Sequence, residues 1–98
     1  MKIIALVAAM AGEEDKKFIQ YLESKGYGYW HWIDGAWLIT TLGSDSSQIT
    51  EIRDEIQKIA PGKYSYVFEV DVKPGWAGFG PNSTDKNMFS WIKTEWYK

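Results

Sequence analysis

Apolar residues form one continuous run near the start of the chain, from residue 2 to residue 9, broken only by its leading lysine. Such a run is typical of a strand that is buried on both faces of a sheet. The run and the small residues around Met10 also resemble a secretory signal. A signal cleaved after Ala11 would be shorter than the roughly 15 to 30 residues that these segments require. The pattern therefore favours a first strand.

Two later segments carry apolar residues at helical spacing. The first begins at the acidic residues 13 to 15, continues to about Lys25 and has Gly26 as its C-terminal stop. The second follows the capping residues 44 to 47 and ends at Pro61-Gly62. Both patterns predict amphipathic helices. Their apolar positions are Phe18, Ile19, Tyr21 and Leu22 in the first helix, and Ile49, Ile52, Ile56 and Ile59 in the second.

Two apolar segments, residues 27 to 33 and 36 to 41, flank the dipeptide Asp34-Gly35. This dipeptide is the strongest short hairpin signal, because a type I′ turn needs a positive φ at both central residues. A two-residue turn pairs Ile33 with Ala36. The expected pairs beyond it are Trp32 with Trp37, His31 with Leu38, and Trp30 with Ile39. Alternation then predicts one face with Trp30, Trp32, Trp37 and Ile39, and another with Tyr29, His31, Ile33, Leu38 and Thr40.

Side chains alternate with period two from Tyr64 to Val72, which predicts a fourth strand that ends at Lys73-Pro74-Gly75. A Gly-rich segment follows. The helical spacing of residues 88, 91, 92 and 96 then predicts a short C-terminal helix capped near Asp85. One face of the strand is expected to carry Tyr64, Tyr66, Phe68, Val70 and Val72, and the other Ser65, Val67, Glu69 and Asp71.

The order strand, helix, strand, strand, helix, strand predicts an α+β fold of the ferredoxin-like βαββαβ type, with both helices on one face of a four-stranded antiparallel sheet. We expect a single domain over residues 1–98, with a core at 1–74 and the Gly-rich loop and C-terminal helix at 75–98. Both faces of the expected strands are apolar, so the face without helices needs a cover. The C-terminal segment or a second copy of the chain could supply it.

The composition narrows the classes of partner. The chain of 98 residues has a net charge of −2, six tryptophans and no cysteine, and Arg53 is its only arginine. A protein dedicated to binding duplex DNA would carry a basic stripe with several arginines, so the sequence argues against this class of protein. The absence of cysteine excludes disulfides and cysteine-ligated zinc and agrees with a cytoplasmic location. No apolar run reaches the roughly 18 residues of a membrane span.

The surplus of aromatic residues is the strongest indication of a contact surface. Tryptophan is common both at protein interfaces and where nucleobases stack, so residue type leaves core packing, dimer contact and ligand binding open. The Gly-rich segment superficially resembles a phosphate-binding loop, but its glycine spacing does not match the dinucleotide fingerprint and no Gly-Lys-Ser/Thr follows. The candidate binding or interface residues are Trp30, His31, Trp32, Trp37, Trp76, Phe79 and Asn82.

Acidic residues give a weaker indication of a metal site. Glu69 and Asp71 share one face of the fourth expected strand, where their carboxylates could hold a divalent cation such as Mg²⁺. No third ligand is identifiable, so charges that protect an edge strand from unwanted pairing are the simpler interpretation. We therefore expect no catalytic residue and no resident metal or other cofactor.

Several short motifs are similar to a known group of proteins. They are Trp30-His31, the Asp34 turn followed by Trp37 to Thr41, the helix from Ile49 to Ile59, the segment Trp76 to Phe79, and the closing Trp91-Ile92-Lys93. These motifs resemble small bacterial and phage proteins of the SinR-like family, relatives of the ferredoxin-like CRISPR-associated spacer-acquisition nucleases. The resemblance spans nearly the whole chain and implies a ferredoxin-like subunit that forms a homodimer across its sheet.

The chain departs from the family at one position. The family's metal-binding aspartate would end the first strand, and Ala9 occupies that place here. Alanine offers no side-chain ligand to Mg²⁺. We therefore expect a non-catalytic, homodimeric binding or adaptor module of phage or mobile-element type that engages a host protein complex, a nucleotide or a single-stranded nucleic acid. The alternative is a metal-dependent nuclease that rebuilt its site from Glu69, Asp71 or His31 and uses Mg²⁺.

Overall fold

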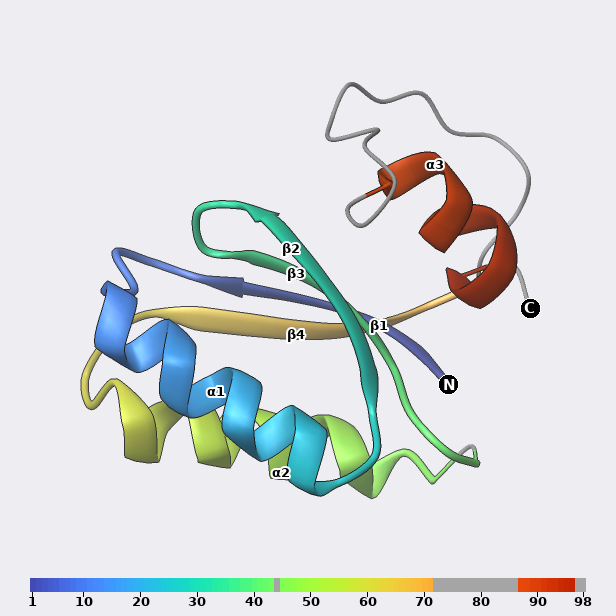
Figure 1. Cartoon of the computed structure of the whole chain (residues 1–98). Helices are drawn as coiled ribbons and strands as arrows, with labels where there is room; N and C mark the ends of the chain where they lie inside the picture. Colours follow the sequence, from blue (N-terminus) through green and yellow to red (C-terminus); the bar gives the residue numbers. More distant parts are fainter. Residues whose placement is uncertain (44, 72–86, 97–98) are drawn as a thin grey trace.

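Four strands form one antiparallel sheet in the computed structural model, which describes residues 1–43, 45–71 and 87–96 (Figure 1). The central strands are β1 (Lys2–Val7) and β3 (Ala36–Thr40). The outer strands are β2 (Gly28–Ile33) beside β3 and β4 (Ser65–Val70) beside β1, so the strand order is β2-β3-β1-β4. The predictions of an α+β fold and of a four-stranded antiparallel sheet are confirmed.

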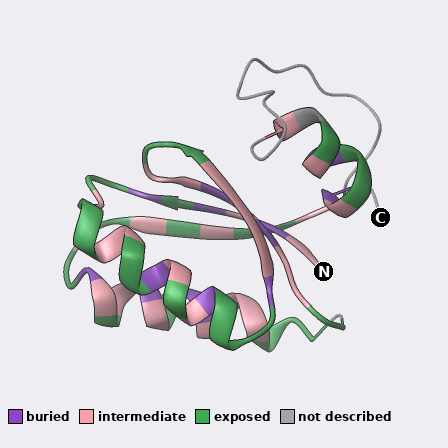
Figure 2. Ribbon diagram, in the orientation of Figure 1, coloured by how far each residue is buried: buried purple, intermediate pink, exposed green. Residues whose placement is uncertain are grey.

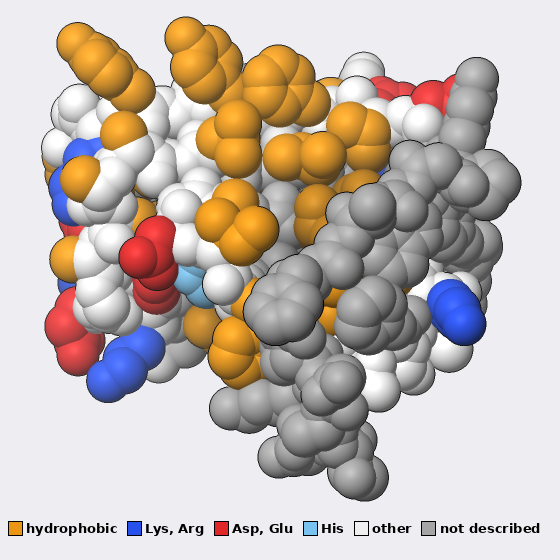
Figure 3. All heavy atoms as spheres, turned by 90° about the horizontal axis from the view of Figure 1, so that it is seen from above, with side chains coloured by type: hydrophobic (Ala, Val, Ile, Leu, Met, Phe, Trp, Pro, Cys, Tyr) orange, Lys and Arg blue, Asp and Glu red, His pale blue; other side chains and the backbone are white. Residues whose placement is uncertain are grey.

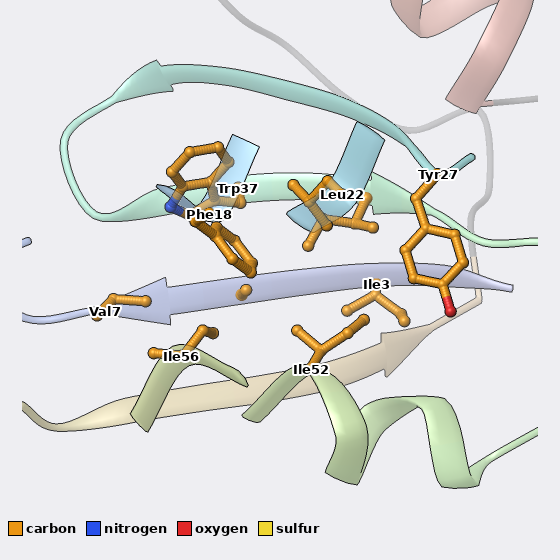
Figure 4. Close-up of a cluster of buried hydrophobic side chains, with 10 residues drawn as sticks. Ile3, Val7, Phe18, Leu22, Tyr27, Trp37, Ile52 and Ile56 are labelled. Atoms are coloured by element: carbon orange, nitrogen blue, oxygen red, sulfur yellow. The ribbon is translucent and has the colours of Figure 1, made fainter. Parts of the chain in front are cut away.

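Two helices, α1 (Gly12–Ser24) and α2 (Ser47–Ile59), cover one face of the sheet (Figure 1). Buried residues gather between these helices and the sheet, where Phe18 and Leu22 of α1 meet Ile52 and Ile56 of α2 (Figures 2 and 4). Among the described residues, no helix is long and apolar enough to cross a lipid bilayer. The other members of this core are Ile3, Ala5, Val7, Tyr27, Trp37 and Ile39.

Local sequence signals fix the ends of both helices. The carboxylate of Glu14 accepts a hydrogen bond from the backbone N–H of Ala11 at 2.8 Å, which satisfies a free donor at the start of α1. Gly26 has a φ of +72° and ends α1 as predicted. Asp45 accepts the backbone N–H of Ser47 at 2.9 Å at the start of α2, and this bond lowers the pKa of its carboxyl.

The hairpin has a different register from the predicted one. The closing pair of Ile33 and Ala36 is confirmed, but Trp30 pairs with Leu38 instead of Ile39. A β-bulge between Trp30 and Ile33 causes this shift, because two residues of β2 stand there opposite one residue of β3. The predicted pair of His31 with Leu38 is wrong for the same reason, whereas Trp37 stands opposite both His31 and Trp32 in the bulge.

The bulge also changes which side chains share a face, because one extra residue reverses the alternation. Trp30 lies opposite Leu38 and Ile4, on the face without helices. Tyr29 lies opposite Ile39, on the helix-covered face. The predicted grouping of Trp30 with Ile39, and of Tyr29 with Leu38, is therefore wrong.

The turn itself is not of the predicted type I′. That type needs positive φ at both central residues, whereas Ala9 is the only non-glycine with a positive φ in the described part of the chain. Gly35 alone supplies the left-handed conformation, with a φ of +72°, and its carbonyl accepts the backbone N–H of Val7 at 2.7 Å. The turn is thus fixed to the central strand β1 as well as to its own hairpin.

A short helix follows at the C-terminal end, as predicted. It begins as α3 (Met88–Trp91) and continues as the π-helical turn η1 (Ile92–Trp96). Asn87 caps it, since its side-chain oxygen accepts the backbone N–H of Ser90 at 2.9 Å. The predicted cap near Asp85 and the Gly-rich loop lie outside the described residues. Figure 1 shows the helix on the opposite side of the sheet from α1 and α2.

Candidate functional site

The aromatic cluster around the hairpin is divided between the two faces of the sheet. Trp37 is only 1% exposed and belongs to the core under α1 (Figure 4). Its ring meets Phe18 edge to face, with centroids 4.8 Å apart. The His31 ring stacks on Trp37, with centroids 3.6 Å apart and the planes 2° from parallel. Core packing is therefore the role of Trp37 and His31 in this fold.

The polar contacts of His31 join α1 to the hairpin. Its Nδ1 lies 2.8 Å from the backbone carbonyl of Ala36, and its Nε2 lies 3.2 Å from a carboxylate oxygen of Asp15. Both ring nitrogens therefore face an oxygen atom, one on β3 and one on α1. The other carboxylate oxygen of Asp15 and the indole N–H of Trp37 are buried and have no hydrogen-bond partner among the described residues. This geometry positions a helix on a sheet and presents no nucleophile to solvent.

Trp30 and Trp32 belong to a row of indole rings outside the core. Trp30 lies 5.7 Å from Trp32 and 5.9 Å from Trp91, measured between ring centroids, and Trp91 lies 6.0 Å from Trp96. The row runs from β2 to the terminal helix, so this helix covers part of the face that α1 and α2 leave open. Trp32, the β2 member of the row farthest from the terminal helix, is 48% exposed.

The rest of that face carries an exposed apolar surface, which we call the free-face patch. It consists of five large side chains whose exposed fractions range from 42% to 84%. Figure 3 looks onto this face and shows the hydrophobic side chains gathered on it. Ile33 is next to Ala36, which pairs with Leu6, and Leu6 pairs with Tyr66, so the patch is continuous across the sheet. Its members are Leu6, Ile33, Tyr64, Tyr66 and Phe68.

A groove of about 430 Å³ lies within the free-face patch, between the hairpin turn and the start of β4. Leu6, Ile33, Tyr64 and Tyr66 line it, together with small residues around Ala8 and Ala36. Among the described residues, Asp34 is the one charged side chain that lines it. The groove can accept an apolar group and offers little to an anion or a metal.

A lysine from another part of the chain, Lys63, lies beside the end of β1, where the SinR-like resemblance implies a metal-binding aspartate. The Nζ of Lys63 donates to the carbonyl of Ala9 at 2.5 Å and to the carboxylate of Glu14 at 2.6 Å. The hydrogen bond from Lys63 is the largest cause of a lowered pKa of the Glu14 carboxyl. A bound ammonium group repels a divalent cation, so this end of β1 is electrostatically unsuited to Mg²⁺.

We expect Lys63→Met to lower stability at neutral pH and to have less effect in acid. The pKa of Glu14 in the folded protein lies below its ordinary value of 4.5, so its ionised form stabilises the fold above that pH. The contribution is lost as the pH falls through the lowered pKa. Urea unfolding at pH 7 should show a lower midpoint for the variant, and at about pH 2 the difference between the two midpoints should be smaller. An equal loss at both pH values would contradict the role of this ion pair.

The two acidic candidates lie near the end of the fourth strand, with Glu69 on β4 and Asp71 just beyond it. Glu69 pairs with Ile3 across the strands, and both Glu69 and Asp71 are exposed at the edge of the sheet. In the described part of the chain, no three His, Cys, Asp or Glu side chains are close enough to hold a metal ion. Three further candidates, Trp76, Phe79 and Asn82, lie outside the described residues.

The sequence predicts an apolar face that the two helices leave uncovered, but the residues of the free-face patch are not among its candidate site residues. The alternation from Tyr64 to Val70 placed all the large rings of β4 on one face. The alternation does not show which face the helices cover. In the structure the helices cover the face with Ser65 and Val67.

No protein-family model matches this chain, and no curated protein matches it either.

Proposed function

We propose that this protein is a non-catalytic, homodimeric binding or adaptor module with a ferredoxin-like fold of the SinR-like type. The observation that carries the proposal is the free-face patch, which the terminal helix leaves exposed. The chain order of the elements and the strand order β2-β3-β1-β4 support the ferredoxin-like assignment. The similarity to SinR-like proteins supports an origin in a phage or mobile element.

The size of the patch supports a protein partner. Its five side chains leave roughly 500 Å² of apolar surface exposed, given about 150 to 250 Å² for each large aromatic side chain. This value lies at the upper end of the roughly 300 to 600 Å² of the largest patch on an ordinary monomer. A standard interface buries about 800 Å² on each partner, of which about 60% is apolar. The patch therefore has the apolar area that one side of such an interface needs.

We propose a non-catalytic protein because of the chemistry around Ala9. The ammonium group of Lys63 lies on the Ala9 carbonyl, which opposes a divalent cation at that place. The alternative, a metal-dependent nuclease, predicts cleavage of RNA or DNA that requires Mg²⁺ or Mn²⁺ and is lost in Asp71→Asn. Cleavage with this dependence would replace the adaptor proposal with the nuclease.

The Trp32 end of the indole row is the proposed contact for a further partner of the cytoplasmic dimer. An exposed indole next to a second indole suits stacking of a nucleobase, which contributes roughly 1 to 3 kcal/mol for each base. Titration with single-stranded oligonucleotides or nucleotides is expected to quench the tryptophan fluorescence. Trp32→Ala should weaken binding about 10-fold or more. Trp30→Ala is unsuitable as a control, because Trp30 also contacts Trp91.

Two outcomes decide between these parts of the proposal. Fluorescence that stays constant with every nucleotide and oligonucleotide would remove the nucleic-acid partner and leave a host protein complex as the partner. A monomer at all accessible concentrations in sedimentation equilibrium would remove the homodimer.

A further inference from the structure

The outer edge of β4 offers a row of backbone groups to a further strand. In the sheet order, no described strand lies beyond β4. The backbone N–H of Ala8 donates to the carbonyl of Tyr64 at 2.9 Å, which makes residues 8 and 64 a hydrogen-bonded pair. Hydrogen-bonded and non-bonded pairs alternate along an antiparallel ladder. The backbone groups of Tyr66 and Phe68 therefore point to β1, and those of Ser65, Val67 and Glu69 point outwards.

We propose that a second copy of this chain adds to this edge, with the two β4 strands antiparallel about a twofold axis at Val67. The proposal rests on the proposed homodimer and names its interface. Around this axis Val67 pairs with Val67 of the other copy, and Ser65 pairs with Glu69. Both are pairs whose backbone groups point outwards, so each can exchange two hydrogen bonds across the axis. The two sheets then become one continuous sheet of eight strands.

The same register brings complementary side chains together. On the free face, Tyr66 stands opposite the partner's Phe68, and the symmetry repeats this pair. Tyr66 and Phe68 already stack within one subunit, with centroids 6.0 Å apart and the planes 16° from parallel. Four rings would therefore join the two free-face patches, and aromatic pairs across strands are favourable. On the other face, the register places Asp71 opposite the partner's Lys63, whose ammonium group also binds Glu14 of its own subunit.

A shift of the twofold axis towards the end of β4 fits less well. Side chains that stand opposite each other must lie on the same face, so the axis moves in steps of whole residues. An axis at Phe68 places Glu69 opposite the apolar Val67 and separates Tyr66 from the partner's ring. The edge at β2 is a poorer choice, because the bulge between Trp30 and Ile33 disrupts its ladder.

Glu69→Pro tests the edge directly. Proline removes the outward N–H of Glu69, and an edge strand tolerates it where that N–H faces solvent. The variant should keep the circular dichroism spectrum of the folded protein and raise the dimer dissociation constant by roughly 100-fold or more. Glu69→Ala is the matched control, because it removes the carboxylate and keeps the backbone N–H. It should sediment as a dimer.

Leu6→Lys separates edge pairing from stacking of two free faces. Leu6 lies on the central strand β1 and is 42% exposed. A lysine there disrupts two stacked faces and leaves the β4 edge intact. A Leu6→Lys dimer together with a Glu69→Pro monomer supports edge pairing. The reverse result overturns it and leaves the proposed homodimer standing, whereas a wild-type monomer removes both.

A second measurement is available if Glu69→Pro does not fold. Tyr66 and the partner's Phe68 form a non-bonded pair, in which the Cα atoms approach to about 4.5 Å. A wild-type sample with one labelled and one unlabelled subunit should therefore show a nuclear Overhauser effect between the Hα atoms of residues 66 and 68 of different subunits. Absence of this contact in a sample that sediments as a dimer overturns the edge pairing.

Discussion

Replacing Trp37 with alanine is expected to lower the free energy of unfolding by about 3 to 5 kcal/mol. Trp37 is 1% exposed, contacts Phe18 edge to face and carries the stacked ring of His31. Its removal leaves a cavity between α1 and the sheet. The His31 ring also loses the surface that holds it between Asp15 and Ala36. Small domains are stable by only about 5 to 15 kcal/mol, so the variant loses a large part of its stability.

Urea unfolding followed by far-ultraviolet circular dichroism measures this loss without relying on tryptophan fluorescence. Trp32→Ala is the matched control, because it removes the same side chain from a position that is 48% exposed. The control should lose about 1 kcal/mol or less. Similar losses in the two variants would contradict the assignment of Trp37 to the core.

The order of elements could be predicted from sequence because each has an independent local signal. The isoleucines of α2 recur at helical spacing, and the helix that buries Ile52 and Ile56 follows from them. Gly26 marked the end of α1, where its positive φ is needed. The tight turn at Asp34-Gly35 also lies where the sequence placed it, between Ile33 and Ala36.

The register of β2 could not be predicted, because both faces of this strand are apolar. In a strand with one polar face, a shift by one residue would expose the apolar set, and this penalty fixes the register. The segment Tyr29 to Ile33 carries large apolar or aromatic residues on both sides, so a bulge costs little there. Contacts from elsewhere decide the outcome, including the stack of His31 on Trp37 and its approach to Asp15.

The presence of apolar residues on both faces also left the residues of the free-face patch out of the candidate site. The tryptophans near the turn attracted the functional interpretation, and one of them, Trp37, belongs to the core. The exposed rings of Tyr66 and Phe68 lie in a strand whose alternation was visible, but a strand pattern does not show which face the helices cover. That choice depends on how β4 pairs with β1, a contact between distant parts of the chain.

Replacing Gly35 with alanine is expected to lower the free energy of unfolding by roughly 2 to 4 kcal/mol. Gly35 has a φ of +72°, which is unfavourable for an L residue with a side chain. A Cβ atom at this position would also overlap the backbone oxygen of Val7. The turn would have to move away from β1, which strains the 2.7 Å hydrogen bond from the Val7 N–H to the Gly35 carbonyl.

Gly26→Ala is a matched control for this substitution, because Gly26 has the same φ of +72° and no other atom within 4 Å of an added Cβ. The Gly26→Ala variant should lose only the free energy of placing an alanine at a positive φ, about 1 kcal/mol. The difference between the two urea-unfolding energies therefore measures the close approach of the turn to β1. Equal losses would mean that the turn shifts freely. In that case the hairpin tip is not held against Val7, and the groove beside Leu6 and Ile33 has no fixed wall on that side.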